Sequence, residues 1–151
     1  CLVQGGRRRQ DSVRIGLESI PKCKWVAIHD GARPCIEHST VVEGVQAAIE
    51  TGASTAGTPI YDTVKRVTSD ELVLSAVERG GLWSIQTPQI FRMDQIIEAH
   101  TTISDDVTDD SSMIELLGRP VTVFNGSPMN IKVTTREDLS LAEAILKTRI
   151  L

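Results

Sequence analysis

Short apolar runs alternate with amphipathic stretches along most of this chain of 151 residues. In the amphipathic stretches, apolar side chains recur every three or four residues, which places them on one face of a helix. This spacing predicts helices over residues 12–20, 40–52, 94–101, 109–117 and 135–146. The short runs, bounded by turn residues, predict strands at 2–3, 25–28, 54–60, 82–86, 121–124 and 131–133. Such alternation is typical of an α/β fold with helices on both faces of a mostly parallel sheet.

Polar residues at the expected helix ends support these boundaries. Asp11 or Ser12 can cap the first helix, and Gly52 can end the second. Two further segments, Thr40–Glu43 and Thr135–Asp138, have the spacing of a capping box, a hydroxyl followed three residues later by an acid.

One pair of apolar runs departs from the alternation of strands and helices. Residues 61–67 and 72–77 flank a polar turn at 68–71, a pattern that predicts a β-hairpin. A hairpin that projects from an α/β body has strand edges that need cover, and pairing with a second subunit is one solution. An exposed edge guarded by lysine and arginine is the other interpretation.

Composition narrows the class of protein. A chain of this length fits one domain, and 40% hydrophobic and 24% charged residues are ordinary for a globular protein. The net charge of -4 argues against a protein that coats nucleic acid or an anionic membrane. No apolar run approaches a membrane-spanning length, and no signal peptide is visible. Three cysteines without metal-ligand spacing predict free thiols in a reducing cytoplasm.

The first residues carry a further expectation. The chain starts at Cys1, without a methionine, and leads directly into the predicted strand at 2–3. We therefore expect it to be part of a longer polypeptide.

Charged residues follow the predicted strand at 25–28 immediately. In open α/β sheets, ligands bind just outside the carboxyl ends of such strands, so Asp30 and Arg33 are expected at the rim of a pocket. Opposite charges at this spacing suit a ligand that carries a metal ion or a phosphate. A surface salt bridge that closes a turn is the alternative, and His29 beside them is more often a structural residue than a catalytic one.

Basic residues precede the first predicted helix. Residues 5–12, Gly-Gly-Arg-Arg-Arg-Gln-Asp-Ser, place two glycines and three arginines at a helix N-terminus, where backbone N–H groups and the helix dipole favour an anion. A solvated basic turn explains the same residues. Lys132 is similarly ambiguous, because it is a phosphate ligand if it points into the crevice and a solubilising charge if it points away.

Six motifs together resemble one family, the 2-C-methyl-D-erythritol 4-phosphate cytidylyltransferases. In the expected order and rough spacing they are Gly5–Ser12, His29–Pro34, Asp62–Lys65, Leu82–Trp83 with Thr87–Gln89, Thr108–Asp109, and Asn130–Lys132 with Asp138–Leu139. The resemblance covers nearly the whole chain. It implies a Rossmann-like nucleotidyltransferase, a three-layer sandwich that forms a single domain over residues 1–151, with a projecting dimerisation arm at about 61–83. It also implies an upstream glycine-rich loop, which carries an arginine and a lysine for the CTP triphosphate and which this chain lacks.

The resemblance gives the residues separate roles. The cytidine end of CTP is expected at Gly6, Arg9 and Ser12, and Mg²⁺ or another divalent cation at Asp30. The sugar-phosphate side is expected at Arg33, Thr87, Thr108 and Lys132. Thr63 and Arg79 lie on the arm, which in the family reaches into the neighbouring subunit's site. Catalysis is expected to depend on Lys132, Asp30 and Arg79.

The function implied by the resemblance is transfer of a cytidylyl group from CTP to methylerythritol phosphate, with release of pyrophosphate, in the non-mevalonate route to isoprenoids. We expect a homodimer with shared sites, in the cytoplasm of a bacterium or in the plastid stroma, and poor catalysis by these residues alone. A ribitol-5-phosphate cytidylyltransferase could share the glycine-arginine turn and the aspartate loop. A non-catalytic dimerisation or nucleotide-sensing module is the alternative from a different class.

Overall fold

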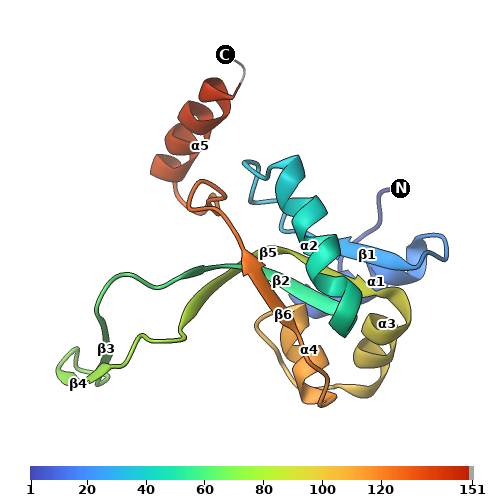
Figure 1. Ribbon diagram of the computed structural model, residues 1–151, viewed down its shortest axis with the longest axis horizontal. Coiled ribbons are helices and arrows are strands. Elements are labelled where there is room, and N and C mark those ends of the chain that lie inside the picture. Colours follow the sequence, from blue (N-terminus) through green and yellow to red (C-terminus); the bar gives the residue numbers. More distant parts are fainter. Residues whose placement is uncertain (150–151) are drawn as a thin grey trace.

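A four-stranded sheet with helices on both faces forms the body of the protein (Figure 1). The computed structural model describes residues 1–149. The helices are α1 (Arg9–Ser19), α2 (His38–Thr51), α3 (Met93–Thr102), α4 (Asp110–Leu116) and α5 (Arg136–Thr148). The strands are β1 (Trp25–Ile28), β2 (Ala53–Pro59), β3 (Val64–Val67), β4 (Val73–Val77), β5 (Trp83–Arg92) and β6 (Thr122–Asn125).

The direction of β5 corrects the expectation of a mostly parallel sheet. The strand order is β1-β5-β2-β6, and β5 runs antiparallel to both of its neighbours. Within the described residues, β2 and β6 form the one parallel pair. The reason is the hairpin between β2 and β5, because a chain that leaves the body along an arm and returns beside it re-enters the sheet antiparallel.

Strand β5 is also longer than the sequence predicts. The predicted strand ends at residue 86, but β5 continues through Thr87-Pro88, whose peptide bond is cis, to Arg92. The strands expected at 2–3 and 131–133 are absent from the described chain. Near the second of these, the Val133 N–H donates to the Ala32 carbonyl at 2.7 Å, but no ladder follows.

Two of the predicted helix starts are wrong, and one is confirmed. Helix α1 begins earlier than expected, with Arg8 as its N-cap residue and Asp11 bonded back to the Arg8 N–H. Helix α2 begins at His38, so Thr40 lies buried in its first turn instead of capping it. The capping box of Thr135 and Asp138 at the start of α5 is confirmed.

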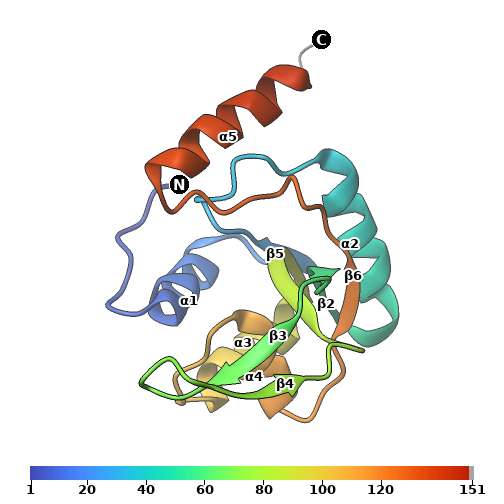
Figure 2. The same cartoon turned by 90° about the vertical axis from the view of Figure 1, so that its left-hand side faces the viewer.

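The three-layer arrangement is confirmed by the packing on the two faces of the sheet. Figure 2 shows α2 on one face and α1, α3 and α4 on the other. Helix α2 approaches closely through Gly44, where a Cβ atom would lie 2.8 Å from Phe124 and 2.9 Å from Ile90. The larger core lies on the opposite face and consists of Leu17, Ala53, Phe91, Met93, Ile96, Ala99, Met113 and Ile114.

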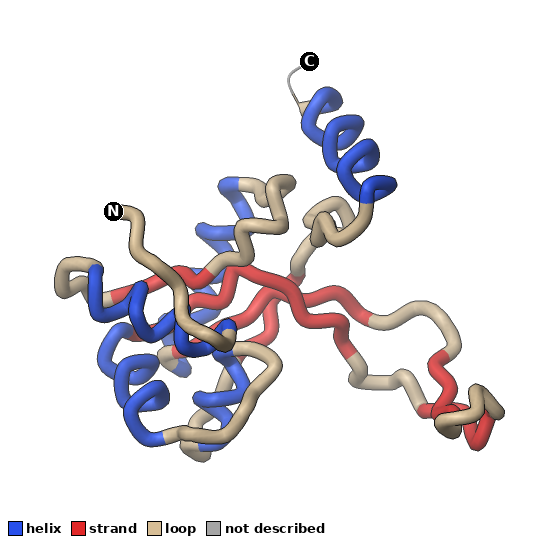
Figure 3. The backbone as a smooth tube through the Cα atoms, turned by 180° about the vertical axis from the view of Figure 1, so that it is seen from behind, coloured by secondary structure: helices blue, strands red, loops and turns tan. Residues whose placement is uncertain are grey.

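Two segments extend from this body. The hairpin β3–β4 forms the outer end of an arm that projects away from the sheet (Figure 3), and Leu72 and Val73 there are 66% and 63% exposed. Helix α5 packs through Ala142 and Ile145 against the buried Cys35. Among the described helices, none is both long and apolar enough to cross a membrane.

Candidate active site

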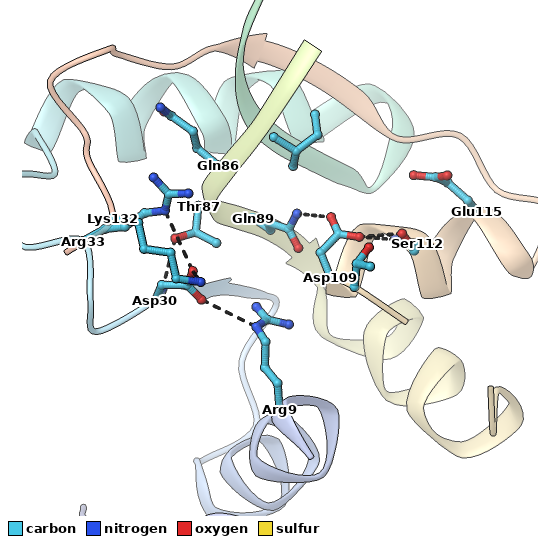
Figure 4. A pocket seen from close by; sticks show the side chains of 12 residues that line it. Arg9, Asp30, Arg33, Gln86, Thr87, Gln89, Asp109, Ser112, Glu115 and Lys132 are labelled. Atoms are coloured by element: carbon cyan, nitrogen blue, oxygen red, sulfur yellow. Dashed lines mark hydrogen bonds and ion pairs between the residues drawn. The ribbon is translucent and has the colours of Figure 1, made fainter. Parts of the chain in front are cut away.

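A polar pocket of about 430 Å³ opens beside the carboxyl end of β1 (Figure 4). The strand register brings its walls together, because Ile28 pairs with Gln89 and Asp30 is therefore level with Thr87 on β5. The lining residues come from α1, the loop after β1, β5, α4 with the two residues before it, and the loop before α5. They are Arg9, Asp30, Arg33, Ile85, Gln86, Thr87, Gln89, Thr108, Asp109, Ser112, Glu115 and Lys132.

Asp30 is the point at which three cations converge. Its carboxylate lies 3.0 Å from Lys132 Nζ, 3.5 Å from Arg9 Nε and 3.8 Å from Arg33 Nε. Burial by itself would raise the pKa of Asp30, but the hydrogen bond and charge of Lys132, with the two arginines, hold it below its ordinary value. Around Asp30, one ionised carboxylate faces three cations, and this local excess of positive charge suits an anionic ligand. The other carboxylates of the lining, Asp109 and Glu115, belong to the wall formed by α4 and the residue before it.

Hydrogen bonds fix the loop that carries Asp30. The Asp30 N–H donates to Thr87 Oγ1 at 3.0 Å, and the His29 ring lies between Thr87 Oγ1 and the Arg33 carbonyl, 3.0 Å from each. The carbonyl can only accept, so the His29 Nε2 atom facing it carries a proton, and in the neutral imidazole Nδ1 then accepts from the Thr87 hydroxyl. His29 therefore has a structural role, as the sequence favours.

The loop before α5 is joined to the same wall. Arg33 Nη1 donates to the Asn130 carbonyl at 2.7 Å, and the buried Asn130 amide donates to the Thr87 carbonyl at 2.8 Å. Burial lowers the pKa of Arg33, and the charge of Asp30 offsets part of that effect. These bonds place Lys132, two residues beyond Asn130, against Asp30.

A buried amide organises the opposite wall. Gln89 Oε1 accepts from the N–H groups of Asp110 and Ser111, and its Nε2 donates to Asp109. Burial would raise the pKa of Asp109, but hydrogen bonds from the hydroxyls of Ser111 and Ser112 and from Gln89 lower it. Asp109 is thus an ionised N-cap of α4, as well as part of the pocket.

Comparison of the whole chain with known proteins identifies its family. Residues 1–148 match the family model described as "IspD: 2-C-methyl-D-erythritol 4-phosphate cytidylyltransferase". The chain belongs to this family. It is 44% identical over 147 residues to the 2-C-methyl-D-erythritol 4-phosphate cytidylyltransferase of Dehalococcoides mccartyi and 47% identical over 153 residues to that of Pelotomaculum thermopropionicum.

Coverage and structural similarity extend the comparison. The chain spans 65% of the length of the first of these relatives and 64% of the second, which cover 97% and 99% of it. A crystal structure of 2-C-methyl-D-erythritol 4-phosphate cytidylyltransferase from Thermus thermophilus superposes with a TM-score of 0.88 at 32% identity. That similarity covers 96% of this chain and 72% of the other. The α/β nucleotidyltransferase fold expected from the sequence is therefore confirmed.

The structure brings six of the predicted site residues of this family member into the pocket: Arg9, Asp30, Arg33, Thr87, Thr108 and Lys132. Gly6 and Ser12 do not line it. Instead the Gly6 N–H donates to Ser12 Oγ at 3.0 Å, a bond that shapes the turn before α1. Thr63 and Arg79 lie on the arm, outside the pocket lining, and Arg79 donates to the Tyr61 carbonyl.

Several pocket and supporting residues were not predicted as site residues. Gln89 carried a signal, since it follows Thr87 and Pro88 in one of the quoted motifs, and Asn130 and Asp109 stand in two others. The remaining lining residues, Ile85, Gln86, Ser112 and Glu115, carried none, because their inclusion depends on the continuation of β5 and the position of α4.

The polar residues of the pocket fit Mg²⁺ only as an ion that is held mainly by the substrate and water. The described residues contain no group of three or more His, Cys, Asp or Glu side chains that could hold a metal ion. Mg²⁺ at a nucleotide site, however, is commonly held by one or two carboxylates, with substrate phosphates and water as its other ligands. Asp30, 17% exposed and ionised, fits as the single protein ligand of that kind.

Proposed function

We propose that the protein to which this chain belongs joins CTP and 2-C-methyl-D-erythritol 4-phosphate and releases pyrophosphate. The observation that carries the proposal is the convergence of Lys132, Arg9 and Arg33 on Asp30 at an open pocket. The printed names of the relatives support the choice of substrates. The family includes bacterial members, and we place this protein in the bacterial cytoplasm as part of the same proposal.

The reaction needs positioning and positive charge more than a strong base. An oxygen of the substrate phosphate is already anionic, and it forms a bond to the α-phosphorus of CTP while the bond from that phosphorus to the bridging oxygen of pyrophosphate breaks. Lys132 and Arg33 neutralise the negative charge that two phosphorylated reactants bring together. Mg²⁺, when bound at Asp30, would supply further charge neutralisation and orientation of the phosphates.

The remaining residues have roles in binding. Arg9, which lines the pocket, would contact the cytidine end of CTP. Gly6 before α1 and Ser12 in its first turn lie outside the lining, and we propose that they contact the same end of CTP. Thr87 and Thr108 would contact the sugar-phosphate side from opposite walls of the pocket. The Thr108 hydroxyl can donate to an anionic oxygen or accept from a sugar hydroxyl, whereas the Thr87 hydroxyl, whose proton is donated to His29 Nδ1, can only accept.

We further propose that two copies assemble through the arm and share their sites. The arm exposes apolar side chains on a two-stranded hairpin, which is marginally stable in water unless it is covered. It also carries Thr63 and Arg79, away from the pocket of its own body. In the neighbouring copy, the Arg79 guanidinium would bind the methylerythritol phosphate group with bidentate geometry.

Release of pyrophosphate tests this function directly. The full-length protein is incubated with CTP, Mg²⁺ and either methylerythritol phosphate or ribitol 5-phosphate. We expect pyrophosphate only with methylerythritol phosphate. Release with ribitol phosphate alone would replace the substrate, and CTP binding without release from either alcohol would favour the nucleotide-sensing alternative.

A further inference from the structure

Two neighbouring arginines at the start of α1 form ion pairs of very different burial. Arg8 Nη1 lies 2.7 Å from Asp106, whose side chain is 80% exposed. Arg9 Nη1 lies at the same distance from Asp110, whose side chain is 0% exposed. The two acids belong to the same stretch of chain before and at the start of α4, so the pairs differ mainly in their access to water.

The buried carboxylate of Asp110 depends on Arg9 for an opposite charge. Its other neighbours are His100 on α3, whose Nε2 lies 3.4 Å away and whose side chain is 3% exposed, and Gln89, which bonds the Asp110 N–H and not its side chain. Neither carboxylate oxygen of Asp110 has a well-directed hydrogen bond in the described chain. A buried carboxylate without such bonds is strongly destabilised unless an opposite charge lies against it, and Arg9 is that charge.

Arg9 faces the pocket at the same time. Its Nε lies 3.5 Å from Asp30 (Figure 4). Its Nη1 lies 2.7 Å from Asp110, so one guanidinium joins the pocket to the buried acid. Burial alone would lower the pKa of Arg9, but Asp110 and then Asp30 raise it. The planar guanidinium has a fixed set of donors, and an anchor on one edge orients the others.

We propose that Asp110 is a positioning residue that holds the Arg9 guanidinium in the orientation needed to bind the nucleotide. The proposal rests on the function given above, in which the nucleotide is CTP and Arg9 faces its cytidine end. Asp110 itself does not line the pocket, so it acts through Arg9 alone. The exposed pair of Arg8 and Asp106 has no such role, because neither residue lines the pocket.

The test compares Asp110→Asn with Asp106→Asn in the full-length protein. Asp110→Asn keeps the shape of the side chain and removes the charge that holds Arg9. We expect the KM for CTP, and the Kd measured by calorimetry, to rise about tenfold, with kcat within about twofold of wild type. Asp106→Asn removes an exposed partner of the adjacent arginine, and we expect both constants to stay at the wild-type values.

A double-mutant cycle separates positioning from a general structural effect. Arg9→Ala raises the KM for CTP by itself. Because Asp110 acts through Arg9, Asp110→Asn should add no further loss of CTP affinity in the Arg9→Ala background. Losses that multiply in the double mutant, or an equal loss in Asp106→Asn, would overturn the proposal.

Other outcomes distinguish this inference from the proposed function. If the wild-type protein neither binds nor turns over CTP, the function fails first. If it binds CTP and Asp110→Asn binds equally well, only the positioning role fails. Should Asp110→Asn not fold, Arg9→Lys keeps a charge beside Asp110 but loses the planar geometry. A raised KM for CTP in Arg9→Lys then supports the proposal, and a wild-type KM contradicts it.

Discussion

The predicted site residues of the body and those of the arm differ in where they lie relative to the pocket. On the body, residues from helix α1, the loop after β1, strand β5 and the loop before α5 converge on one pocket, and Asp30 alone is approached by three cations. On the arm, Thr63 and Arg79 lie outside the pocket lining of the same chain. The body therefore assembles a charged site from a single copy, whereas the arm, as we propose, contributes to the site of another copy.

The largest effect is expected from Lys132→Ala on the body. It removes the cation closest to Asp30, one that we place at the reacting phosphates. Loss of a group of this kind lowers kcat by about 10²- to 10³-fold. Steady-state turnover of the full-length enzyme measures it, and circular dichroism checks that the fold is kept.

Lys147→Ala is the matched control for that substitution. Lys147 lies on α5, is 71% exposed and pairs only with Glu143 in the described chain, so its loss should leave kcat unchanged. Near-normal turnover of Lys132→Ala would remove Lys132 from the mechanism. It would also contradict the view that the cations of the body form the catalytic part of the site.

Mixed dimers test whether the arm of one subunit completes the site of the other, and the expected change in turnover is smaller than that of Lys132→Ala. Asp30→Asn, and Arg79→Ala assayed at methylerythritol phosphate concentrations well below its raised KM, each impair both sites of a homodimer. If sites are shared, the two variants complement each other. A mixed dimer then regains one intact site, formed by the Asp30 of one subunit and the Arg79 of the other. Random equal mixing makes half of the dimers mixed, so about a quarter of wild-type turnover should return.

The unmixed variants are the baseline for this experiment. Arg79→Ala alone should mainly raise the KM for methylerythritol phosphate and leave that for CTP unchanged, since Arg79 lies on the arm and not in the pocket. No recovery on mixing, under conditions where subunits exchange, would mean that the sites are self-contained. Body and arm would then have to meet within one chain.

The sequence predicted the part of the site that follows local signals. Asp30 and Arg33 stand directly after an apolar run, so their place at a strand end could be inferred from that run alone. The antiparallel direction of β5 could not, because it results from the return of the arm. The predicted end of this strand at residue 86 was wrong for a different reason, because proline is usually excluded from the middle of a sheet but Pro88 lies within β5.

The burial of two polar residues, Gln89 and Asp110, could not be predicted for a different reason. Gln89 and Asp110 are polar side chains of a kind usually found at the surface, and nothing in their own neighbourhoods marks them as buried. Their partners make burial tolerable, and the most important of these, Arg9, lies about a hundred residues from Asp110. Such pairs become visible only when the topology brings α1 and α4 together.

The smallest expected effect is a change in thermal stability. The experiment compares loss of a carboxylate on the body, Asp109, with loss of one on the arm, Asp70. Asp109 accepts from Gln89 Nε2 and Ser111 Oγ on one oxygen, and from the N–H and Oγ of Ser112 on the other. In Asp109→Asn, the new NH₂ group must face one of these two sets of donors, and the hydrogen bonds on that side are lost because two donors cannot bond each other. We therefore expect Tm to fall by about 4 °C at neutral pH. Asp70→Asn on the exposed arm is the control, because Asp70 has no ion pair in the described chain and its replacement should leave Tm unchanged.

The difference between wild type and Asp109→Asn should also depend on pH. The folded state lowers the pKa of Asp109 from its ordinary value of 3.8, so the ionised group stabilises the fold fully above that value. The stabilisation is lost as the pH falls through the lowered pKa, and the two unfolding curves should approach each other there. A difference in Tm that stays constant from neutral pH into this acidic range would show that the charge of Asp109 contributes nothing, and that shape alone orders this wall of the pocket.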